Sequence, residues 1–322
     1  MNESEMRHAI GVDFGGTSVK LALVNERGVI LGRRKFETRE APTQGEWLER
    51  VAREVRDLHE KEGGNCPIAG VGVGVPGFVD FERGYIYELP NVPGWNGVHL
   101  GPMLEDRLGL RTRIDNDVNA MALGECTFGA GRTYQHAVFV TLGTGVGGGL
   151  LINNKLYRGA HWMAGEIGHV SIDMNGIPSP TGFGGVEQYV GNRRIVERME
   201  KAIDSGRPTI LLDLVGGDRS KLSPRVLKEA ADKGDAVALE ILDYVTDCLA
   251  TAFASITYIL QPQAFIVGGG VAEDAKLLFQ LLRKNVDKRL SAHFSRRLEI
   301  KPAELGSDAG VIGCATLALI EQ

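Results

Sequence analysis

Two related glycine-rich turns are the parts of this sequence best suited to chemistry on a phosphate chain. Each follows an apolar run that predicts a strand, and each combines glycine with hydroxyl residues: Gly15-Gly16-Thr17 in the first, and Thr141-Leu142-Gly143-Thr144-Gly145 in the second. Glycine carries no Cβ to cover the backbone, so such turns expose N–H groups that suit phosphate oxygens. Two of them in one chain predict two lobes that grip one phosphate chain.

Charged side chains flank the first turn. Asp13 ends the strand before it, where a carboxylate can hold Mg²⁺ through water, and Lys20 follows in the next strand. Thr17 and the backbone N–H groups would then face the phosphate oxygens. A plain hairpin needs neither an acid directly before it nor a threonine after it, so the pattern favours function. Thr141 and Thr144 supply the corresponding hydroxyls in the second turn.

A polar run between a predicted strand and a predicted helix supplies a candidate general base. The run is Asp115-Asn116-Asp117-Val118-Asn119. One of its polar side chains can cap the helix, but capping does not need the others. Asp117 is the candidate base, which would accept the proton of an attacking hydroxyl as that oxygen approaches a γ-phosphate.

Two carboxylates and an imidazole in a long glycine-rich loop predict a site for a polyhydroxylated ligand. Glu166 and His169 lie close together in this loop, and Glu187 follows near its end. Vicinal hydroxyls need hydrogen-bond acceptors and bidentate contacts, which these groups can supply with Asn116. Asn91 is either a further donor to the ligand or an ordinary turn residue.

A mixed α/β chain must position these residues. In the first part of the sequence, strands are predicted at 9–13, 19–24, 29–36, 68–75 and 111–114, with a helix at 44–62. This order recurs later in looser form, which predicts two pseudo-equivalent lobes with the ligand between them. We place an N-terminal lobe at residues 1–117 and a larger C-terminal lobe at 118–308, with the closing helix at 309–322 packed back on the first lobe.

Composition narrows the class of protein. With 322 residues, 43% hydrophobic and 24% charged, the chain has room for two domains and a large core. A net charge of −5 without a Lys/Arg run argues against a nucleic-acid partner. The longest apolar run, 249–260, is too short to span a bilayer, and no signal peptide precedes the first strand. The four cysteines form no CxxC pair, which is typical of reduced thiols. We therefore expect a cytoplasmic protein without a membrane or nucleic-acid partner.

Two nucleotide-binding motifs are excluded by their context. Gly72–Gly77 and Gly143–Gly148 both match the dinucleotide fingerprint, but strand-like residues follow each of them where that fingerprint must open a helix. A Walker sequence is absent from the chain. Any phosphate chemistry must therefore use another cradle.

Taken together, the motifs resemble those of the ROK family, which comprises sugar kinases, including many bacterial glucokinases, and sugar-responsive repressors. The matching segments, in the family's order, are Asp13–Lys20, Gly74–Gly77, Asn116–Glu125, Thr141–Gly149 and Gly165–His169. The resemblance implies the actin-like ATPase (ribonuclease H-like) fold of the hexokinase type, with two lobes and an interdomain cleft. It also suggests a homodimer.

The resemblance implies roles for individual residues. The residues implied to bind ATP and Mg²⁺ are Asp13, which would hold the metal through water, with Gly15, Gly16, Thr17, Lys20, Thr141, Gly143, Thr144, Gly145 and, near the nucleoside, Gly268, Gly269 and Gly270. Those implied to bind the sugar are Gly77, Asn91, Asn116, Asp117, Glu166, His169 and Glu187. Asp117 is the implied catalytic base.

One departure from the family concerns zinc. Most members carry a CxCGxxGC motif between the segment that holds His169 and the second glutamate, and the histidine ligand of that zinc would fall on His169. The aligned stretch here, Pro178–Gly185, contains no cysteine. His169 alone cannot hold a structural zinc ion, so no zinc site is predicted.

The motifs favour ATP-dependent phosphorylation of a hexose, with the 6-hydroxyl of glucose as acceptor. An N-acetylmannosamine or N-acetylglucosamine kinase is the alternative, because all these sugars share the 3-, 4- and 6-hydroxyl end. A sugar-sensing repressor is disfavoured, since only eight residues precede the first predicted strand and Asp117 is retained. A non-catalytic sugar-binding module is disfavoured by the intact turns. Polyphosphate stays open as a donor, although no basic tract for a long anion is visible.

Overall fold

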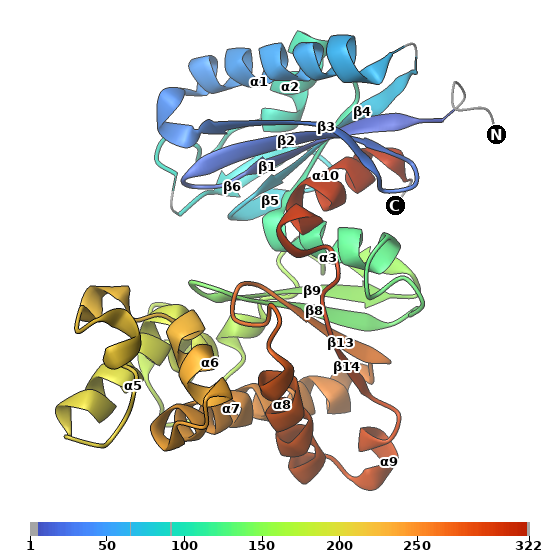
Figure 1. The fold of residues 1–322 in the computed structure, drawn as a ribbon. Helices are drawn as coiled ribbons and strands as arrows, with labels where there is room; N and C mark the ends of the chain where they lie inside the picture. The colour runs from blue at the N-terminus through green and yellow to red at the C-terminus, as the bar shows by residue number, and fades with distance from the viewer. Residues whose placement is uncertain (1–5, 65, 91, 321–322) are drawn as a thin grey trace. The chain divides into compact units, whose positions relative to one another are not determined.

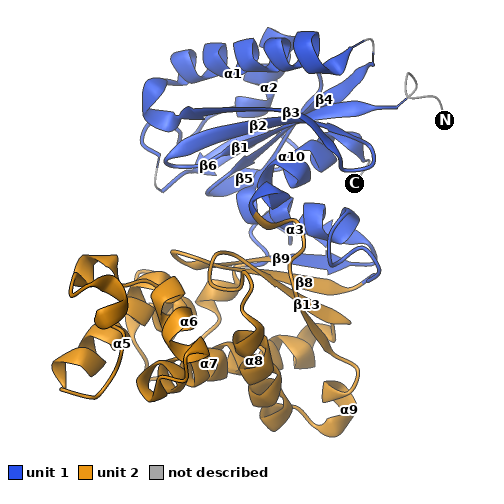
Figure 2. Cartoon of the chain, in the orientation of Figure 1, with its two compact units in different colours: residues 1–135, 149–165, 307–322 blue, residues 136–148, 166–306 orange. Residues whose placement is uncertain are grey.

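The computed structural model describes residues 6–64, 66–90 and 92–320. They divide into two compact units (Figure 2): unit 1 is formed by residues 1–135, 149–165 and 307–322, and unit 2 by residues 136–148 and 166–306. Unit 1 therefore extends beyond the boundary that the sequence suggested after residue 117, because the helix that follows packs against the C-terminal helix of the same unit. Within the described residues, no helix combines the length and apolar character that crossing a membrane requires.

Unit 1 is built on a mixed five-stranded sheet of order β3-β2-β1-β4-β7 (Figure 1). Its strands are β1 (His8–Phe14), β2 (Ser18–Asn25), β3 (Ile30–Glu37), β4 (Ile68–Val75) and β7 (Thr112–Asn116). The first three strands pair antiparallel, whereas β1, β4 and β7 run parallel. Parallel strands end at the same edge of a sheet, so residues that follow β1, β4 and β7 are brought together.

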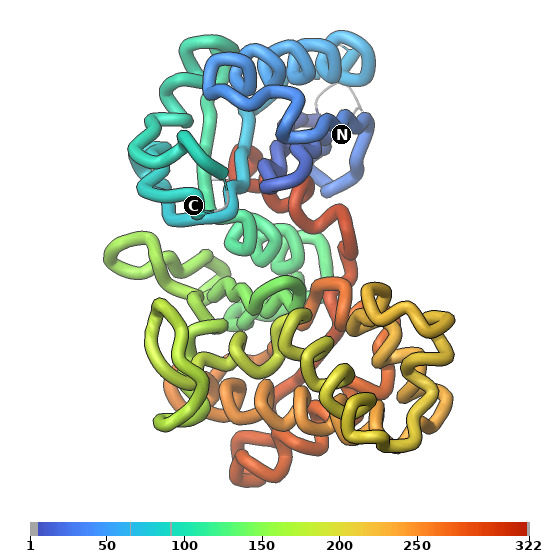
Figure 3. The backbone as a smooth tube through the Cα atoms, turned by 90° about the vertical axis from the view of Figure 1, so that its left-hand side faces the viewer, coloured from blue at the N-terminus to red at the C-terminus, as the bar shows by residue number. Residues whose placement is uncertain are grey.

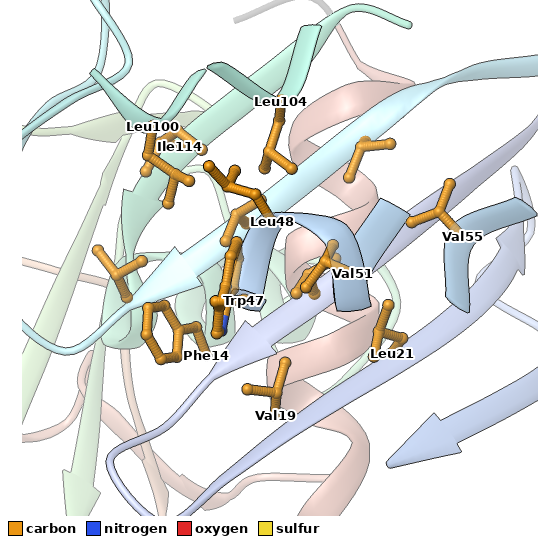
Figure 4. Packing of buried hydrophobic residues seen from close by; sticks show 14 of the residues in the cluster. Phe14, Val19, Leu21, Trp47, Leu48, Val51, Val55, Leu100, Leu104 and Ile114 are labelled. Atoms are coloured by element: carbon orange, nitrogen blue, oxygen red, sulfur yellow. The ribbon is translucent and has the colours of Figure 1, made fainter. Parts of the chain in front are cut away.

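The main core of unit 1 lies between one face of this sheet and helices α1 (Gln44–Leu58) and α2 (Leu100–Leu108) (Figure 4). Thr43 and Glu46 form a capping box that begins α1, and the apolar stripe of the helix then faces the sheet. The Trp47 ring, fully buried, packs with its centroid 4.6 Å from that of Phe14 and 5.1 Å from that of Trp95. The strand that carries Asp13 is thereby anchored at its end.

The opposite face of the sheet is covered by α10 (Ala309–Leu319) and α3 (Asp117–Thr127), so that the C-terminal helix lies among N-terminal strands (Figures 1 and 3). Glycines on this face let the helix lie directly on the strands. A Cβ on Gly72 would come 1.8 Å from the carbonyl oxygen of Cys314, and one on Gly11 would come 1.9 Å from that of Val311. Gly72 and Gly74, the first two glycines of the apparent dinucleotide motif, therefore serve helix packing.

Gly72→Ala is expected to lower the free energy of unfolding of unit 1 by about 1–3 kcal/mol or more, because the new methyl group meets helix backbone rather than a movable side chain. Urea unfolding followed by tryptophan fluorescence measures this change, since Trp47, Trp95 and Trp162, which are all the tryptophans, belong to unit 1. Gly45→Ala, in α1 with nothing within 4 Å of the added Cβ, is the control and is expected to be neutral or slightly stabilising. Equal stability of the two variants would contradict the packing argument.

A second five-stranded sheet has the order β10-β9-β8-β13-β14, and its strands β8, β13 and β14 belong to unit 2. The strands are β8 (Ala137–Leu142), β9 (Val146–Ile152), β10 (Lys155–Tyr157), β13 (Ala264–Gly268) and β14 (Glu299–Pro302), of which β9 runs on into unit 1 with β10. The larger helices are α5 (Asn192–Asp204), α6 (Pro224–Asp232), α7 (Ala236–Leu260) and α8 (Lys276–Arg289). The apolar run at 249–260 is the second half of α7, whose Phe253 stacks on Phe265 of β13 with centroids 4.0 Å apart.

Shorter elements complete the chain. The small strands are β5 (Phe78–Asp80), β6 (Tyr85–Glu88), β11 (Pro178–Ser179) and β12 (Gly182–Phe183), and the short α-helices are α4 (Glu187–Val190) and α9 (Ala292–Ser295). Single helical turns are η2 (Thr38–Glu40), η3 (His59–Gly63), η4 (Ile167–His169), η5 (Asp213–Val215), η6 (Arg219–Lys221) and η7 (Gly306–Asp308). Of these, β11, β12, η4 and α4 carry or support candidate site residues.

Candidate active site

Three acidic residues of unit 1, Asp13, Asp115 and Asp117, lie at the edge where β1, β4 and β7 end. The register places Asp13 beside Gly74, and Gly74 beside Asp115. The thiol of Cys314 is buried under this edge, and its pKa is raised well above the usual value, first by burial and then by the charges of Asp13, Asp117 and Asp115. The structure thus brings the acid of the first turn close to the candidate base.

The first glycine-rich turn joins β1 to β2 and leaves its tip open to solvent. The Gly15 N–H donates to the carbonyl of Ser18 at 3.0 Å, and the Thr38 hydroxyl donates to the Gly15 carbonyl at 2.7 Å. Gly16 and Thr17 are exposed. The turn is therefore fixed at its base while its tip can meet a ligand.

Asp13 and Lys20 face each other across β1 and β2. They are direct partners in the register, and the Lys20 Nζ lies 3.9 Å from a carboxylate oxygen of Asp13. Burial raises the pKa of Asp13, and the nearby Lys20 charge opposes that rise. Asp13 also lies against the start of α10, because a Cβ on Gly310 would come 2.8 Å from its carboxylate. A cation at this carboxylate would offset the cost of burying it.

Asn116 is the residue that caps α3, which answers a question the sequence left open. Its Oδ1 accepts from the N–H groups of Val118 at 2.9 Å and Asn119 at 3.1 Å. Its Nδ2 donates to the carbonyl of Gly77 at 3.2 Å, so two predicted sugar-contacting residues lie side by side. Asp117 begins the helix directly after this cap, and one of its carboxylate oxygens accepts from the Val118 N–H at 2.9 Å.

A buried ion pair supports this turn, and no local sequence pattern indicates it. Asp115 is 1% exposed, and its Oδ2 accepts from Arg158 Nε at 2.8 Å and lies 2.7 Å from Arg158 Nη2. Its Oδ1 accepts from the Asn116 N–H at 2.8 Å and from Asn119 Nδ2 at 3.0 Å. The guanidinium of Arg158 lies 3.7 Å from the ring centroid of Phe81. No local motif marks Arg158, which is 43 residues from its partner.

In unit 2, Glu187 meets the second glycine-rich turn. Glu187 begins α4, and its Oε2 accepts from the Val146 N–H at 2.9 Å. A Cβ on Gly145 would come 2.3 Å from the same carboxylate, and one on Gly168 would lie 3.2 Å from it. Within the turn, the Gly143 N–H donates to the Gly145 carbonyl at 3.0 Å. Candidate phosphate-binding and sugar-binding residues are therefore in direct contact here.

Glu166 and His169 lie at the two ends of η4, close to Glu187. The Nε2 of His169 is 3.7 Å from Oε2 of Glu166, and both side chains are well exposed, at 38% and 46%. The pKa of Glu166 is raised, mainly by partial desolvation of its carboxyl group; His169 opposes the rise, and the charge of Glu187 adds to it. These three predicted sugar-contacting residues form one cluster.

The glycine triplet 268–270, which begins with the last residue of β13, packs beside the second turn and reaches a cavity. Gly269 has a φ of +89°, and a Cβ there would come 2.1 Å from the Leu142 carbonyl oxygen. Gly270 lines a cavity of 840 Å³ in unit 2, and Asn192 lies on its wall. The Asn192 Oδ1 is buried and makes no hydrogen bond to any described residue, while its N–H donates to the Gly143 carbonyl at 3.0 Å. The cavity and the second turn thus share a wall.

Asn91 lies outside the described residues, and nothing is assigned to it. Across the part of the chain that is described, no three His, Cys, Asp or Glu side chains come together in a group that could hold a metal ion. The other predicted residues fall into a unit 1 group around Asp13 and Asp117 and a unit 2 group around Glu187.

Comparison with known proteins identifies the family. The profile of the ROK family matches residues 9–321. The chain belongs to the ROK family. The glucokinase of Thermotoga maritima is 35% identical over 308 residues, which cover 96% of each chain. The N-acetyl-D-glucosamine kinase of Mannheimia succiniciproducens is 31% identical, over 96% of this chain and 98% of the other.

A solved ROK structure supports the same assignment. The ROK glucokinase of Streptomyces griseus, in complex with glucose and AMPPNP, superposes with a TM-score of 0.79 at 32% identity, over 97% of this chain and 99% of that one. The expected α/β fold of the actin-like ATPase class is thereby confirmed.

Three residues beside the candidate site are not predicted from the sequence. They are Arg158, Asn192 and Thr181, whose Oγ1 lies 3.0 Å from Nδ1 of His169.

Proposed function

We propose that this ROK protein is an ATP-dependent hexose kinase and that its acceptor is the 6-hydroxyl of glucose. The observation that carries the proposal is the pairing, at one sheet edge, of an acid followed by an open glycine turn with an Asp at the start of a helix. Phosphoryl transfer requires a phosphate cradle and a nearby base, and little other protein chemistry. The 35% identity with a glucokinase over 96% of the chain supports glucose as the substrate.

The first turn would hold the phosphate end of ATP. Gly15, Gly16 and Thr17 offer N–H and hydroxyl donors, and Lys20 offers a positive charge near Asp13. The carboxylate of Asp13, which is 15% exposed, fits Mg²⁺, which keeps most of its water shell and binds through one or two carboxylates. When bound, the metal would neutralise phosphate charge.

The second turn and the glycine triplet would hold the rest of the nucleotide. Thr141, Gly143, Thr144 and Gly145 supply donors for phosphate, and Gly268, Gly269 and Gly270 form the approach to the cavity. At 840 Å³ this cavity has the size of ordinary small-molecule sites. The buried Asn192 Oδ1 is an acceptor that a nucleoside hydroxyl can satisfy.

We propose sugar-binding roles for residues of each unit, as the family resemblance implies. Glu166, Glu187 and His169 would bind hydroxyls in unit 2. In unit 1, Asn116 Oδ1 caps the helix, so Asn116 would donate to the sugar through its amide N–H groups, which lie beside the backbone of Gly77. Asp117 would accept the proton of the 6-hydroxyl as that oxygen attacks the γ-phosphate.

ADP release across a panel of sugars tests this function. The panel is glucose, mannose, fructose, allose, N-acetylglucosamine and N-acetylmannosamine, each with Mg²⁺-ATP and with an EDTA control. Polyphosphate is tested as donor by measuring sugar phosphate, because that reaction releases no ADP. Glucose is expected to give the highest kcat/KM. A clear preference for an N-acetylated sugar would instead establish the alternative, which the 31% identity with an N-acetylglucosamine kinase supports. If folded protein phosphorylates none of these sugars, the result would contradict a kinase.

Glu187→Gln is expected to move the acid limb of kcat/KM for the sugar to lower pH. Glu166 must be a carboxylate to accept hydrogen bonds from hydroxyls, and its pKa is raised by burial and by the Glu187 charge. Removing that charge lowers the Glu166 pKa, so the carboxylate persists to lower pH. Profiles from about pH 5 to 9 measure the shift, with the exposed Glu60→Gln as control. An acid limb that stays in place would show that Glu166 does not control it.

A homodimer in the cytoplasm is part of the same proposal, supported by the family resemblance. Size-exclusion chromatography with light scattering measures the mass of the assembly. A mass near twice the 34.8 kDa of one chain is expected. A mass near that of one chain, at concentrations used for assays, would overturn the dimer without affecting the kinase assignment.

A further inference from the structure

A chain of hydroxyl groups ends on the imidazole of His169. The Ser179 Oγ donates to the Gly182 carbonyl at 3.1 Å and lies 3.0 Å from Thr181 Oγ1. Thr181 Oγ1 in turn lies 3.0 Å from Nδ1 of His169. All of these groups belong to unit 2, and the hydroxyls lie on the β11–β12 hairpin, in the stretch where no cysteine is found.

The hairpin is fixed relative to η4 by backbone hydrogen bonds. Its flanking residues pair back on the loop: the Gly184 N–H donates to the Ile177 carbonyl and the Ile172 N–H to the Gly184 carbonyl, each at 2.9 Å. The Val186 N–H donates to the Val170 carbonyl, directly after His169, at 3.0 Å. The distance from Thr181 to the ring is therefore set by main-chain structure, not by the two side chains alone.

The number of hydrogens on each group determines which group donates in each of these hydrogen bonds. A carbonyl oxygen can only accept, so the single hydrogen of the Ser179 hydroxyl is committed to Gly182. The contact between Ser179 and Thr181 then uses the Thr181 hydrogen. Thr181 has no second hydrogen, so the hydrogen between Thr181 and His169 must sit on Nδ1 of the ring. All three contacts are satisfied at once only in this direction.

We propose that Thr181 and Ser179 are positioning residues that hold neutral His169 as its Nδ1–H tautomer, so that Nε2 acts as a hydrogen-bond acceptor toward the substrate. Nε2 lies 3.7 Å from the Glu166 carboxylate, another acceptor, and both groups are exposed. Two adjacent acceptors select a ligand that presents two donating hydroxyls, as a sugar with a free vicinal diol does. The substrate part of this inference rests on the proposed function, whereas the tautomer does not.

The tautomer can be observed directly by NMR. Long-range ¹H–¹⁵N correlation on protein labelled at histidine distinguishes a ring nitrogen that carries hydrogen from one that does not, and His169→Gln assigns the signals. At about pH 8.5, where an ordinary imidazole is neutral, wild type is expected to carry hydrogen on Nδ1. Thr181→Ser is expected to keep this signature and Thr181→Val to lose it. Ser179→Ala frees the Thr181 hydrogen to point at the ring and is expected to shift hydrogen to Nε2.

Kinetics on the same variants tests the consequence for the substrate. Thr181→Val is expected to raise KM for the sugar about 3- to 10-fold with kcat within about 2-fold, as for a lost neutral hydrogen bond, and Thr181→Ser is expected to restore KM. Hydrogen on Nε2 in wild type, or an unchanged tautomer in Thr181→Val, would overturn the proposal. A correct tautomer in a protein that phosphorylates no sugar would leave the hydroxyl chain standing and overturn the proposed function.

Discussion

Asp117→Asn is expected to lower kcat for glucose phosphorylation by about 100- to 10,000-fold, which is the usual contribution of a general base. The amide has nearly the shape of the carboxylate but cannot take the proton of the sugar hydroxyl. The cap of α3 should survive, because Asn116 Oδ1 accepts from the N–H groups of Val118 and Asn119. The amide oxygen of the variant can also still accept from the Val118 N–H, as the Asp117 carboxylate does. The dissociation constant for glucose should therefore change little.

Steady-state kinetics and calorimetric titration of glucose separate these two effects. Asp106→Asn, on the exposed side of α2 in the same unit, makes the same chemical change away from the site and is expected to keep full activity. Turnover by Asp117→Asn within a few-fold of wild type would mean that another group accepts the proton. A loss of glucose binding in this variant would mean that Asp117 binds the ground state, which would remove the case for a base.

The sequence could predict the parts of the fold and site that are encoded locally. The turn after Asp13 and the polar run before α3 each combine strand, turn and helix signals within a few residues, and the structure has them where they were expected. The parallel ends of β1, β4 and β7 then bring Asp13 and Asp117 to one edge. Local patterns suffice here because parallel topology aligns strand ends.

Contacts between distant segments could not be predicted in the same way. Gly72 and Gly74 of β4 look like part of a nucleotide motif, and the position of α10 on the sheet explains them. The absence of cysteines from Pro178–Gly185 indicates what does not hold His169, but not that Thr181 contacts the ring. Arg158 has no local signature, because its role depends on Asp115, a distant partner in β7. In each case a side chain acquires its meaning from tertiary packing.

Arg158→Met is expected to lower the free energy of unfolding of unit 1 by about 3–5 kcal/mol, the usual cost of leaving one member of a buried ion pair alone. Methionine keeps much of the aliphatic length but leaves the Asp115 carboxylate, which is 1% exposed, without its cation. The Asp115 carboxylate also accepts from the Asn116 N–H and so positions the turn that carries Asn116 and Asp117. We therefore expect kcat to fall as well. Urea unfolding followed by tryptophan fluorescence measures the loss. Arg53→Met, which removes an exposed partner of Glu54, is the control and should cost less than about 1 kcal/mol.

The stability deficit of Arg158→Met should depend on pH in a defined direction. Burial already raises the pKa of Asp115 above its ordinary value of 3.8, and Arg158 opposes that rise. Without Arg158 the folded-state pKa rises further, so the folded protein takes up a proton at a pH where the unfolded chain does not. Stability is then gained as the pH falls through the raised pKa, and the deficit relative to wild type should be largest at neutral and alkaline pH.

A second substitution separates the buried charge from lost packing. Asp115→Asn in the Arg158→Met background removes the stranded charge but keeps an oxygen that can accept from the Asn116 N–H and Asn119 Nδ2. If the charge is the main cost, the double variant is more stable than Arg158→Met alone at pH 8 and loses the pH dependence of the deficit. If the contact of Arg158 with the Phe81 ring dominates instead, the double variant is no more stable than the single one at any pH. The second result would reduce Arg158 to a packing residue, and the ion pair would then no longer explain how the turn beneath Asp117 is held.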